Sequence, residues 1–178
     1  MQVDFFERQP ALAAQRASLA GSINGLARSF RDARQPIVWI RQEFKPDLSD
    51  AFLEMRCRRI KLTIEGTAGC EILPELERPS SERVIVKKRY SAFFGTDLDE
   101  QLGGIGPEVL VLAGINTHAC IRTTAIDAYQ RDYDVVIASD CIASYDDEHH
   151  RVTLRYLEGQ IARLMSSKEI TQLLPSRT

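Results

Sequence analysis

The sequence predicts an α/β domain in which helices cover both faces of a mostly parallel sheet, a three-layer α-β-α arrangement. Short apolar runs rich in β-branched residues alternate along the chain with longer amphipathic segments, which is the pattern of βαβ crossovers. The 178 residues show no internal repeat or low-complexity tract. A chain of this length can bury a core without disulfides or metals. We therefore expect a single domain over residues 1–178.

The first part of the chain begins with a long amphipathic segment. Apolar residues recur at helical spacing over residues 10–33, and Gln35-Pro36 ends that helix. A β-branched and aromatic run over 37–40 predicts a buried strand. A second helix is expected over 51–60, and a turn follows at 65–69.

The second part repeats the alternation. Apolar runs predict strands, and helical spacing predicts the segments between them. In chain order we expect strand 84–86, helix 96–102, strand 109–115, helix 117–131, strand 135–138 and a closing helix over 146–165.

Composition excludes several classes of protein. Lys and Arg number 23 against 25 Asp and Glu, so the net charge of −2 offers no basic surface for nucleic acid or anionic membrane. No apolar run is long enough to span a bilayer, and the amino-terminal residues lack the layout of a secretion signal. The four cysteines have no metal-binding or disulfide-framework spacing. We expect a cytoplasmic protein whose partner is a small molecule or another protein.

The segment around Cys120 has the features of a nucleophile site. The strand 109–115 breaks at Gly114 and delivers Cys120 into the first turn of the next helix, with Thr117 as the expected N-cap. The helix dipole and unpaired N–H groups favour the thiolate at such a position. The alternative is that Cys120 is a small buried core residue, as free cysteines commonly are.

Lys87 stands in the corresponding place on another strand. It follows 84–86, and ligands bind at the carboxyl edge of open α/β sheets. A lysine there stabilises a neighbouring thiolate. The alternative is a solvated basic corner formed with the next two residues. The histidines, His118 and His149-His150, have no partner at metal-ligand spacing, so we expect no metal site, an exposed helix start at 149–150, and His118 turned away from the site.

Three segments together resemble a known family, the isochorismatase-like cysteine hydrolases, which include nicotinamidases, N-carbamoylsarcosine amidase and ureidoacrylate amidohydrolases. The resemblance runs from Met1-Gln2 to Ser139-Asp140. The segments that carry it are Lys87-Lys-Arg-Tyr-Ser-Ala-Phe-Phe-Gly-Thr-Asp-Leu98, Gly114-Ile-Asn-Thr-His-Ala-Cys120 and Glu65-Gly-Thr-Ala-Gly69.

The resemblance implies a reaction. Cys120 would attack an amide or carbamoyl carbon, expel ammonia or an amine, and leave a thioester for water to hydrolyse. Lys87 would assist ionisation of the thiol. The backbone N–H groups of Asn116 and Cys120 would hold the oxyanion, with a cis peptide between Ile115 and Asn116. No cofactor is implied, and the chain is expected to form a homodimer or homotetramer.

Substrate choice is less determined. Arg41, Tyr90 and Phe93 are candidates to line the pocket, with Arg41 suited to a carboxylate, although aromatic residues after a strand are commonly core. The nicotinamidase branch has a metal site of Asp and His, and this chain has no histidine before His118, which disfavours a nicotinamidase. The thiol of Cys120 favours C–N hydrolysis over cleavage of a vinyl ether.

The resemblance also implies a catalytic Asp at the end of a first strand, in an Asp-Met-Gln-x-x-Phe motif. This chain begins at the Met of that motif, so the Asp would directly precede Met1, and Asp4 would match a second acidic position. In the family the first strand lies between the strands expected here at 37–40 and 109–115. We therefore expect two unpaired interior edges and a longer natural chain. The alternative is a catalytically impaired member that serves as an oligomeric scaffold or ligand-binding module.

Overall fold

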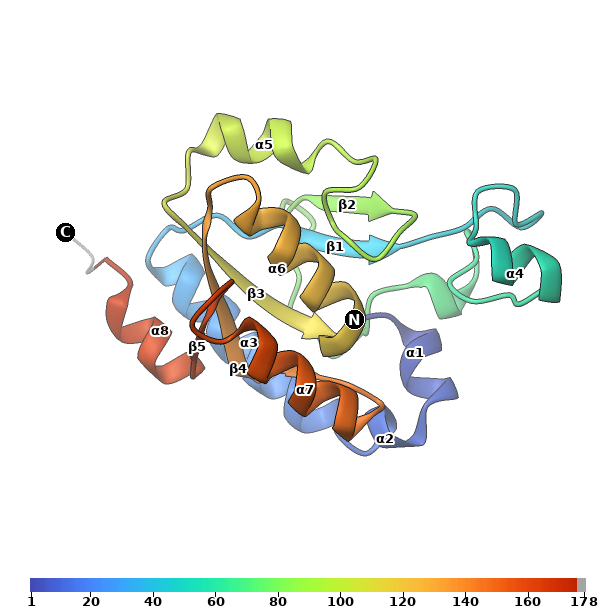
Figure 1. Cartoon of the computed structure of the whole chain (residues 1–178), viewed down its shortest axis with the longest axis horizontal. Helices are drawn as coiled ribbons and strands as arrows, with labels where there is room; N and C mark the ends of the chain where they lie inside the picture. Colours follow the sequence, from blue (N-terminus) through green and yellow to red (C-terminus); the bar gives the residue numbers. More distant parts are fainter. Residues whose placement is uncertain (176–178) are drawn as a thin grey trace.

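Residues 1–175 are described by a computed structural model in which parallel strands lie between two layers of helices (Figure 1). The strands are β1 (Trp39–Gln42), β2 (Val84–Lys87), β3 (Val109–Ile115), β4 (Asp134–Ala143) and β5 (Arg163–Met165). The α-helices of the described residues are α1 (Val3–Arg8), α2 (Pro10–Ala13), α3 (Arg16–Asp32), α4 (Leu53–Arg58), α5 (Leu98–Ile105), α6 (Arg122–Tyr129), α7 (Asp147–Leu157) and α8 (Ser167–Leu173). This arrangement confirms the predicted α/β class.

The alternation of side chains along β4 explains the two helical layers. Val136 and Ala138 pack in one core with residues of α3 and α8, whereas Val135 and Ile137 pack in a second core with residues of α5, α6 and α7. Successive side chains of a strand point to opposite faces, so the run 135–138 of β4, which is apolar at every position, is buried from both sides. Strand β4 thus lies in the middle layer, as its composition predicts.

The strands form two separate parallel sheets. One contains β1 and β2, in register from Trp39 opposite Val84 to Gln42 opposite Lys87; the other has the order β3-β4-β5. Within the described residues β1 pairs only with β2, and β3 borders only β4. The edges expected to be unpaired are therefore unpaired.

The two free edges face each other across a cavity of about 230 Å³. Its walls come from residues 36–40 beside β1 and 111–114 of β3, and the apolar face of α3 adds Ile23, Leu26 and Phe30. The carboxyl-terminal residues of β1 and β3 meet again around a second, smaller cavity. The two edges consequently run in the same direction, with a gap between the half-sheets.

The prediction of a closing helix over 146–165 is wrong for the second half of that range. Helix α7 ends at Leu157, and Gly159 adopts a positive φ of 73° that L-residues rarely take. The chain then forms the short strand β5, whose residues pair with Val136, Ile137 and Ala138. Pairing with a neighbouring strand, which the local sequence pattern does not encode, overrides the helical spacing there.

The amino-terminal residues are fastened to the end of β1. The Gln2 amide donates to the carbonyl of Gln42 at 2.6 Å and accepts from the Gln42 N–H at 2.8 Å, and it also donates to the Cys70 carbonyl at 2.6 Å. Helix α1 lies against the 3₁₀ turn Ala68–Cys70 (Figure 1). The side chain of Gln2 therefore satisfies the backbone N–H and carbonyl of Gln42, as a neighbouring strand would do. None of the helices in residues 1–175 is of a length and apolarity that would cross a bilayer.

Candidate active site

Cys120 lies on a single π-helical turn, Thr117–Ile121, that joins β3 to α6. The peptide bond between Ile115 and Asn116 is cis. The backbone carbonyl of Asn116 accepts from the N–H groups of Ala119 and Ile121 at 3.1 and 3.2 Å, which fixes the start of the turn. A π-turn inside a helix is rare and is frequent at functional sites. The nucleophile candidate is thus held in an unusual backbone segment directly after the end of β3.

The expectation that Thr117 caps this helix is wrong. Asn116 occupies the cap position without a side-chain cap bond, and Thr117 is fully buried as the first residue of the turn. Its hydroxyl lies 2.9 Å from Nδ1 of His150, so it is engaged by a distant side chain instead of the local backbone. The Asn116 side chain is also buried, and its amide oxygen finds no hydrogen-bond donor among the described residues.

Lys87 is the last residue of β2 and is 5% exposed. Its Nζ donates to the backbone carbonyl of Tyr90, and it forms no ion pair within the described part of the chain. A buried ammonium that meets only a neutral acceptor is costly unless an anion lies near. The solvated basic corner therefore does not describe Lys87, although its neighbour Lys88 does pair with Asp50 at the surface, at 2.9 Å.

Lys87 and Cys120 line one cavity of about 100 Å³. Ile40 and Gln42 of β1 and residues 112–115 of β3 complete much of its wall. The amino group of Met1 is buried there as well: burial lowers its pKa to about 6, Cys120 raises it and Lys87 lowers it. The lining residues include no carboxylate. The site brings a thiol and a buried amine together at the carboxyl edge of the strands.

Of the three residues expected to line the pocket, Tyr90 approaches the nucleophile. Burial raises the pKa of its phenol, and the nearby Cys120 adds to that rise. The ring packs on Phe52 with centroids 4.9 Å apart. Tyr90 is about half exposed, and it is not among the residues that line the cavity of Cys120 and Lys87.

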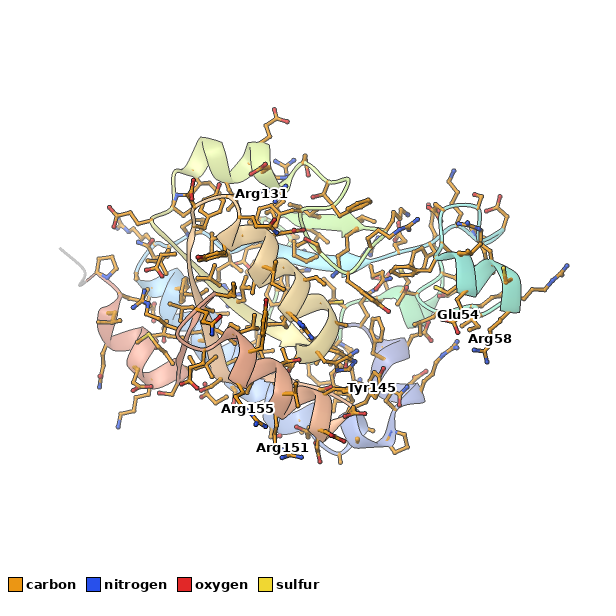
Figure 2. All side chains as sticks on the ribbon, viewed as in Figure 1. Glu54, Arg58, Arg131, Tyr145, Arg151 and Arg155 are labelled. Carbon is orange, nitrogen blue, oxygen red and sulfur yellow. The ribbon has the colours of Figure 1, made fainter. Side chains whose placement is uncertain are left out.

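Phe93 and Arg41 are not brought to the cavity. Phe93 is a core residue that stacks on Tyr133 and lies under the guanidinium of Arg131, which Figure 2 shows at the end of α6 near α5. Arg41 pairs with Glu43 at 2.5 Å and with Glu71 at 3.4 Å beside a different cavity. Since its strand neighbours at 40 and 42 face the Cys120 cavity, alternation directs Arg41 to the other face of the sheet.

The sequence also missed the role of two histidines. His118 was expected to turn away from the site, and it is not among the residues that line the cavity of Cys120; the contact of its Nδ1 with the Ser144 hydroxyl, at 2.6 Å, was not predicted. His150 was expected at an exposed helix start and instead contacts Thr117. His149 is exposed and pairs with Asp146 at 3.4 Å, as its expected position implies. The partners are 26 and 33 residues apart along the chain, so no local sequence pattern predicts these contacts.

The remaining cysteines differ from Cys120 in environment. Burial raises the pKa of the Cys70 and Cys141 thiols to about 12, with Glu43 and Asp140 adding to the respective rises. Cys57 is exposed on α4. All four thiols are free, and no group of three or more His, Cys, Asp or Glu side chains in residues 1–175 is arranged to hold a metal ion.

Comparison with known proteins places these features in a family. The family model of the isochorismatase domain matches residues 1–169. The uncharacterized isochorismatase family protein YecD of Escherichia coli O157:H7 is 30% identical over 157 residues, which cover 84% of this chain and 79% of that protein. Alignments with two further relatives, YwoC of Bacillus subtilis and PhzD1 of Pseudomonas aeruginosa, span about half of those proteins.

Solved structures agree with this assignment. An isochorismatase family protein from Desulfovibrio vulgaris has a TM-score of 0.81 at 29% identity, with 88% of this chain and 84% of that chain covered. Nicotinamidase/pyrazinamidase from Bacillus subtilis has a TM-score of 0.76 at 27% identity, with 84% and 85% covered. N-carbamoylsarcosine amidase from Thermoplasma acidophilum has a TM-score of 0.72 at 26% identity, with 85% and 83% covered. This chain, with its hydrolase fold, therefore belongs to the isochorismatase family.

Proposed function

We propose that this protein is a cysteine hydrolase that cleaves the C–N bond of a small amide or carbamoyl compound through a thioester. The observation that carries the proposal is the shared cavity of Lys87 and Cys120, which come from different half-sheets. An amine that is buried without an ion-pair partner is an electrostatic partner for the anionic form of a thiol in the same cavity. Neither a core cysteine nor a surface lysine accounts for that pair.

The reaction would proceed in two halves. The Cys120 thiolate attacks the carbonyl carbon, and the backbone N–H groups of Asn116 and Cys120 stabilise the oxyanion, each such donor contributing about 3–4 kcal/mol in related chemistry. The C–N bond then breaks, the leaving nitrogen takes up the proton that the Cys120 thiol had released, and the acyl group stays on sulfur as a thioester. Water hydrolyses the thioester and returns the thiol. Lys87 would stabilise the negative charge on sulfur before the attack and again when the thioester is cleaved.

Hydrolysis of the thioester also needs a general base that activates water. The resemblance assigns it to an aspartate directly before Met1, and the cavity lining contains no carboxylate. Asp4 is committed elsewhere, since its carboxylate accepts from the Thr63 N–H at 2.6 Å and contacts Arg8 at 3.4 Å. This observation favours the second candidate, a catalytically impaired family member that binds a ligand or serves as a scaffold.

Substrate class rests on the nucleophile and on the relatives. A thiol forms a thioester from an amide or carbamoyl carbon, and two structurally similar proteins are a nicotinamidase and an N-carbamoylsarcosine amidase. The absence of a histidine before His118 keeps a nicotinamidase disfavoured, since that branch uses Asp and His as metal ligands. The homo-oligomeric state and cytoplasmic location stay predictions.

An ammonia-release screen tests the proposal. Primary amides, ureas and carbamoyl amino acids are offered to the protein and to Cys120→Ala and Lys87→Met, with Cys57→Ala as the matched control. We expect release to vanish in Cys120→Ala, to fall in Lys87→Met, and to persist in Cys57→Ala. Hydroxylamine added during turnover should capture the acyl group as a hydroxamate. Unchanged release by Cys120→Ala refutes a cysteine mechanism, and no release from any compound by the parent protein supports the impaired member.

A further inference from the structure

The three histidines of the sequence gather at one junction, between the π-turn that carries Cys120 and the first turn of α7. His118 comes from the π-turn, and His149 and His150 come from α7. The rings of His118 and His149 lie 5.5 Å apart, and Tyr145 meets His118 edge-on at 4.9 Å. Figure 2 shows Tyr145 at this end of α7. The chain has no other histidine, so the grouping is complete.

Two of these histidines tie the π-turn to the segment after β4. Nδ1 of His118 lies 2.6 Å from the Ser144 hydroxyl, and that hydroxyl oxygen also accepts from the Asp146 N–H at 3.2 Å. Nδ1 of His150 lies 2.9 Å from the Thr117 hydroxyl. Thr117 and Ser144 are almost fully buried, so water does not replace either bond.

The two bonds flank the nucleophile closely in sequence. Thr117 and His118 directly precede Ala119 and Cys120 on the same turn. Each bond joins residues that are far apart along the chain. In each bond the hydroxyl partner, Ser144 or Thr117, is a buried side chain. A displacement of about 1 Å at a reacting group costs about 100-fold in rate. The orientation of Cys120 therefore depends on contacts that its own segment does not supply.

We propose that His118 and His150 are positioning residues that hold the Cys120 turn against α7. The inference rests on the proposed function only in taking Cys120 as the nucleophile. Loss of either bond lets the π-turn shift or relax, and the thiol then spends less time directed into the cavity that it shares with Lys87.

The charge state of the junction follows from its surroundings. Burial lowers the pKa of His118, and His149 and His150 lower it further while Asp146 raises it. Burial likewise lowers the pKa of His150, which Asp147 partly offsets. Both imidazoles are consequently neutral at pH 7. Because the pKa of each of these two imidazoles lies below the ordinary histidine value of about 6.5, the unfolded chain takes up protons that the packed junction does not, and acidification below that value disfavours the junction.

The rate of Cys120 alkylation by limiting iodoacetamide tests the proposal, because it needs no substrate. Cys57, exposed on α4, serves as the internal reference in peptide mapping. We expect His150→Leu and His118→Leu to lower the Cys120 rate about 10-fold or more relative to Cys57. The conservative His150→Asn and His118→Asn place a polar atom near the Nδ1 position and should recover most of it. His149→Gln is the matched control, and its rate should stay within about twofold of the parent rate.

Two further variants remove the same bonds from the other side and guard against misfolding of the leucine variants. Thr117→Val and Ser144→Ala should reproduce the slower alkylation, and Thr117→Val combined with His150→Leu should be no slower than either alone. The parent rate should fall below pH 6.5 more steeply than that of His118→Asn. Folded variants that lack a bond and alkylate Cys120 at the parent rate overturn the proposal. If the variants alkylate Cys120 more slowly and the parent protein hydrolyses no amide, the positioning role of His118 and His150 is supported. The proposed function is then wrong.

Discussion

The carboxylate of Asp4 accepts a hydrogen bond from the backbone N–H of Thr63, with 2.6 Å between Oδ2 and N. The same carboxylate packs directly on Gly69, where an added Cβ would lie 2.4 Å from its carboxyl carbon. Asp4 thus joins α1 to two loops that are distant in sequence. The Asp4 carboxylate therefore stabilises the packing of α1 against these loops. It does not line the cavity of Cys120 and Lys87.

The Asp4 contact makes Gly69 a position with no room for a side chain. Gly69→Ala should push the carboxylate off Thr63 and lower the free energy of unfolding by about 1–3 kcal/mol. Gly21→Ala is the matched control, since nothing lies within 4 Å of a Cβ there and the position is inside α3. That change should raise stability by about 0.5–1 kcal/mol. Urea unfolding of both variants measures the difference, and equal stability of the two would contradict the contact.

Reactivity should rank the four thiols in a definite order. We expect Cys120 to react fastest with iodoacetamide at pH 7.5 because of its buried amine neighbour, with Cys57 next because it is exposed. Cys70 and Cys141 should stay unlabelled until the protein is unfolded, because burial raises the pKa of both to about 12. Peptide mapping after limiting reagent gives the order. Equal labelling of Cys120 and Cys57 would count against a tuned nucleophile.

The same two buried thiols predict a loss of stability in alkali. Their folded pKa of about 12 lies above the unfolded value of 9.0, so between those values the unfolded chain has released protons that the folded chain retains. Stability supplied by the neutral thiols is complete below pH 9 and declines as pH rises toward 12. Urea unfolding between pH 8 and 10.5 should show this decline, and a variant with both Cys70→Ala and Cys141→Ala should show a flatter one. If the free energy of unfolding declined equally steeply with pH in the parent and in this variant, groups other than Cys70 and Cys141 would be responsible for the decline.

The gap between β1 and β3 predicts the effect of an added strand. An extension of about six apolar β-branched residues in front of Met1, ending in Asp, is expected to pair with both free edges. Paired edges and a filled cavity should raise the melting temperature by several degrees, and a carboxylate beside Lys87 and Cys120 should raise amide turnover by about 10²–10⁴-fold.

Two matched extensions separate the effects of that strand. The same segment ending in Asn should raise the melting temperature and leave turnover low. A Gly-Ser extension of equal length should change neither quantity. Full turnover by the 178-residue chain itself would show that another carboxylate serves as the base, and an apolar extension without any rise in melting temperature would show that the gap does not accept a strand.

The positions of two strands along the chain were readable from the local sequence. The run 109–115 predicted β3 to the residue, and 84–86 missed only the final Lys87 of β2. Both runs are apolar at consecutive positions; in β3, Val111 packs against one core and Leu110 and Leu112 against the other, and such a pattern is visible without any partner. The placement of Lys87 and Cys120 at one sheet edge followed from the same pattern, since the carboxyl ends of parallel strands lie together.

Only the tertiary structure decided which groups surround Cys120. The hydroxyl of Thr117 was predicted to cap the local helix, and instead it bonds to His150 in a later element. Arg41 was expected in the pocket, but the half-sheet turns it toward Glu43 and Glu71. Helical spacing likewise extended over residues that pair with β4 as β5.

The sequence by itself therefore determined the α/β class, the middle-layer strands and the two residues at the sheet edge, because burial on both faces and element order are recorded in the local pattern. The tertiary structure decided the π-turn, the histidine contacts and the gap between the half-sheets. These features depend on which distant side chain satisfies a hydroxyl or which strand borders an edge. Such choices are set by packing among elements, and no spacing within a single element records them.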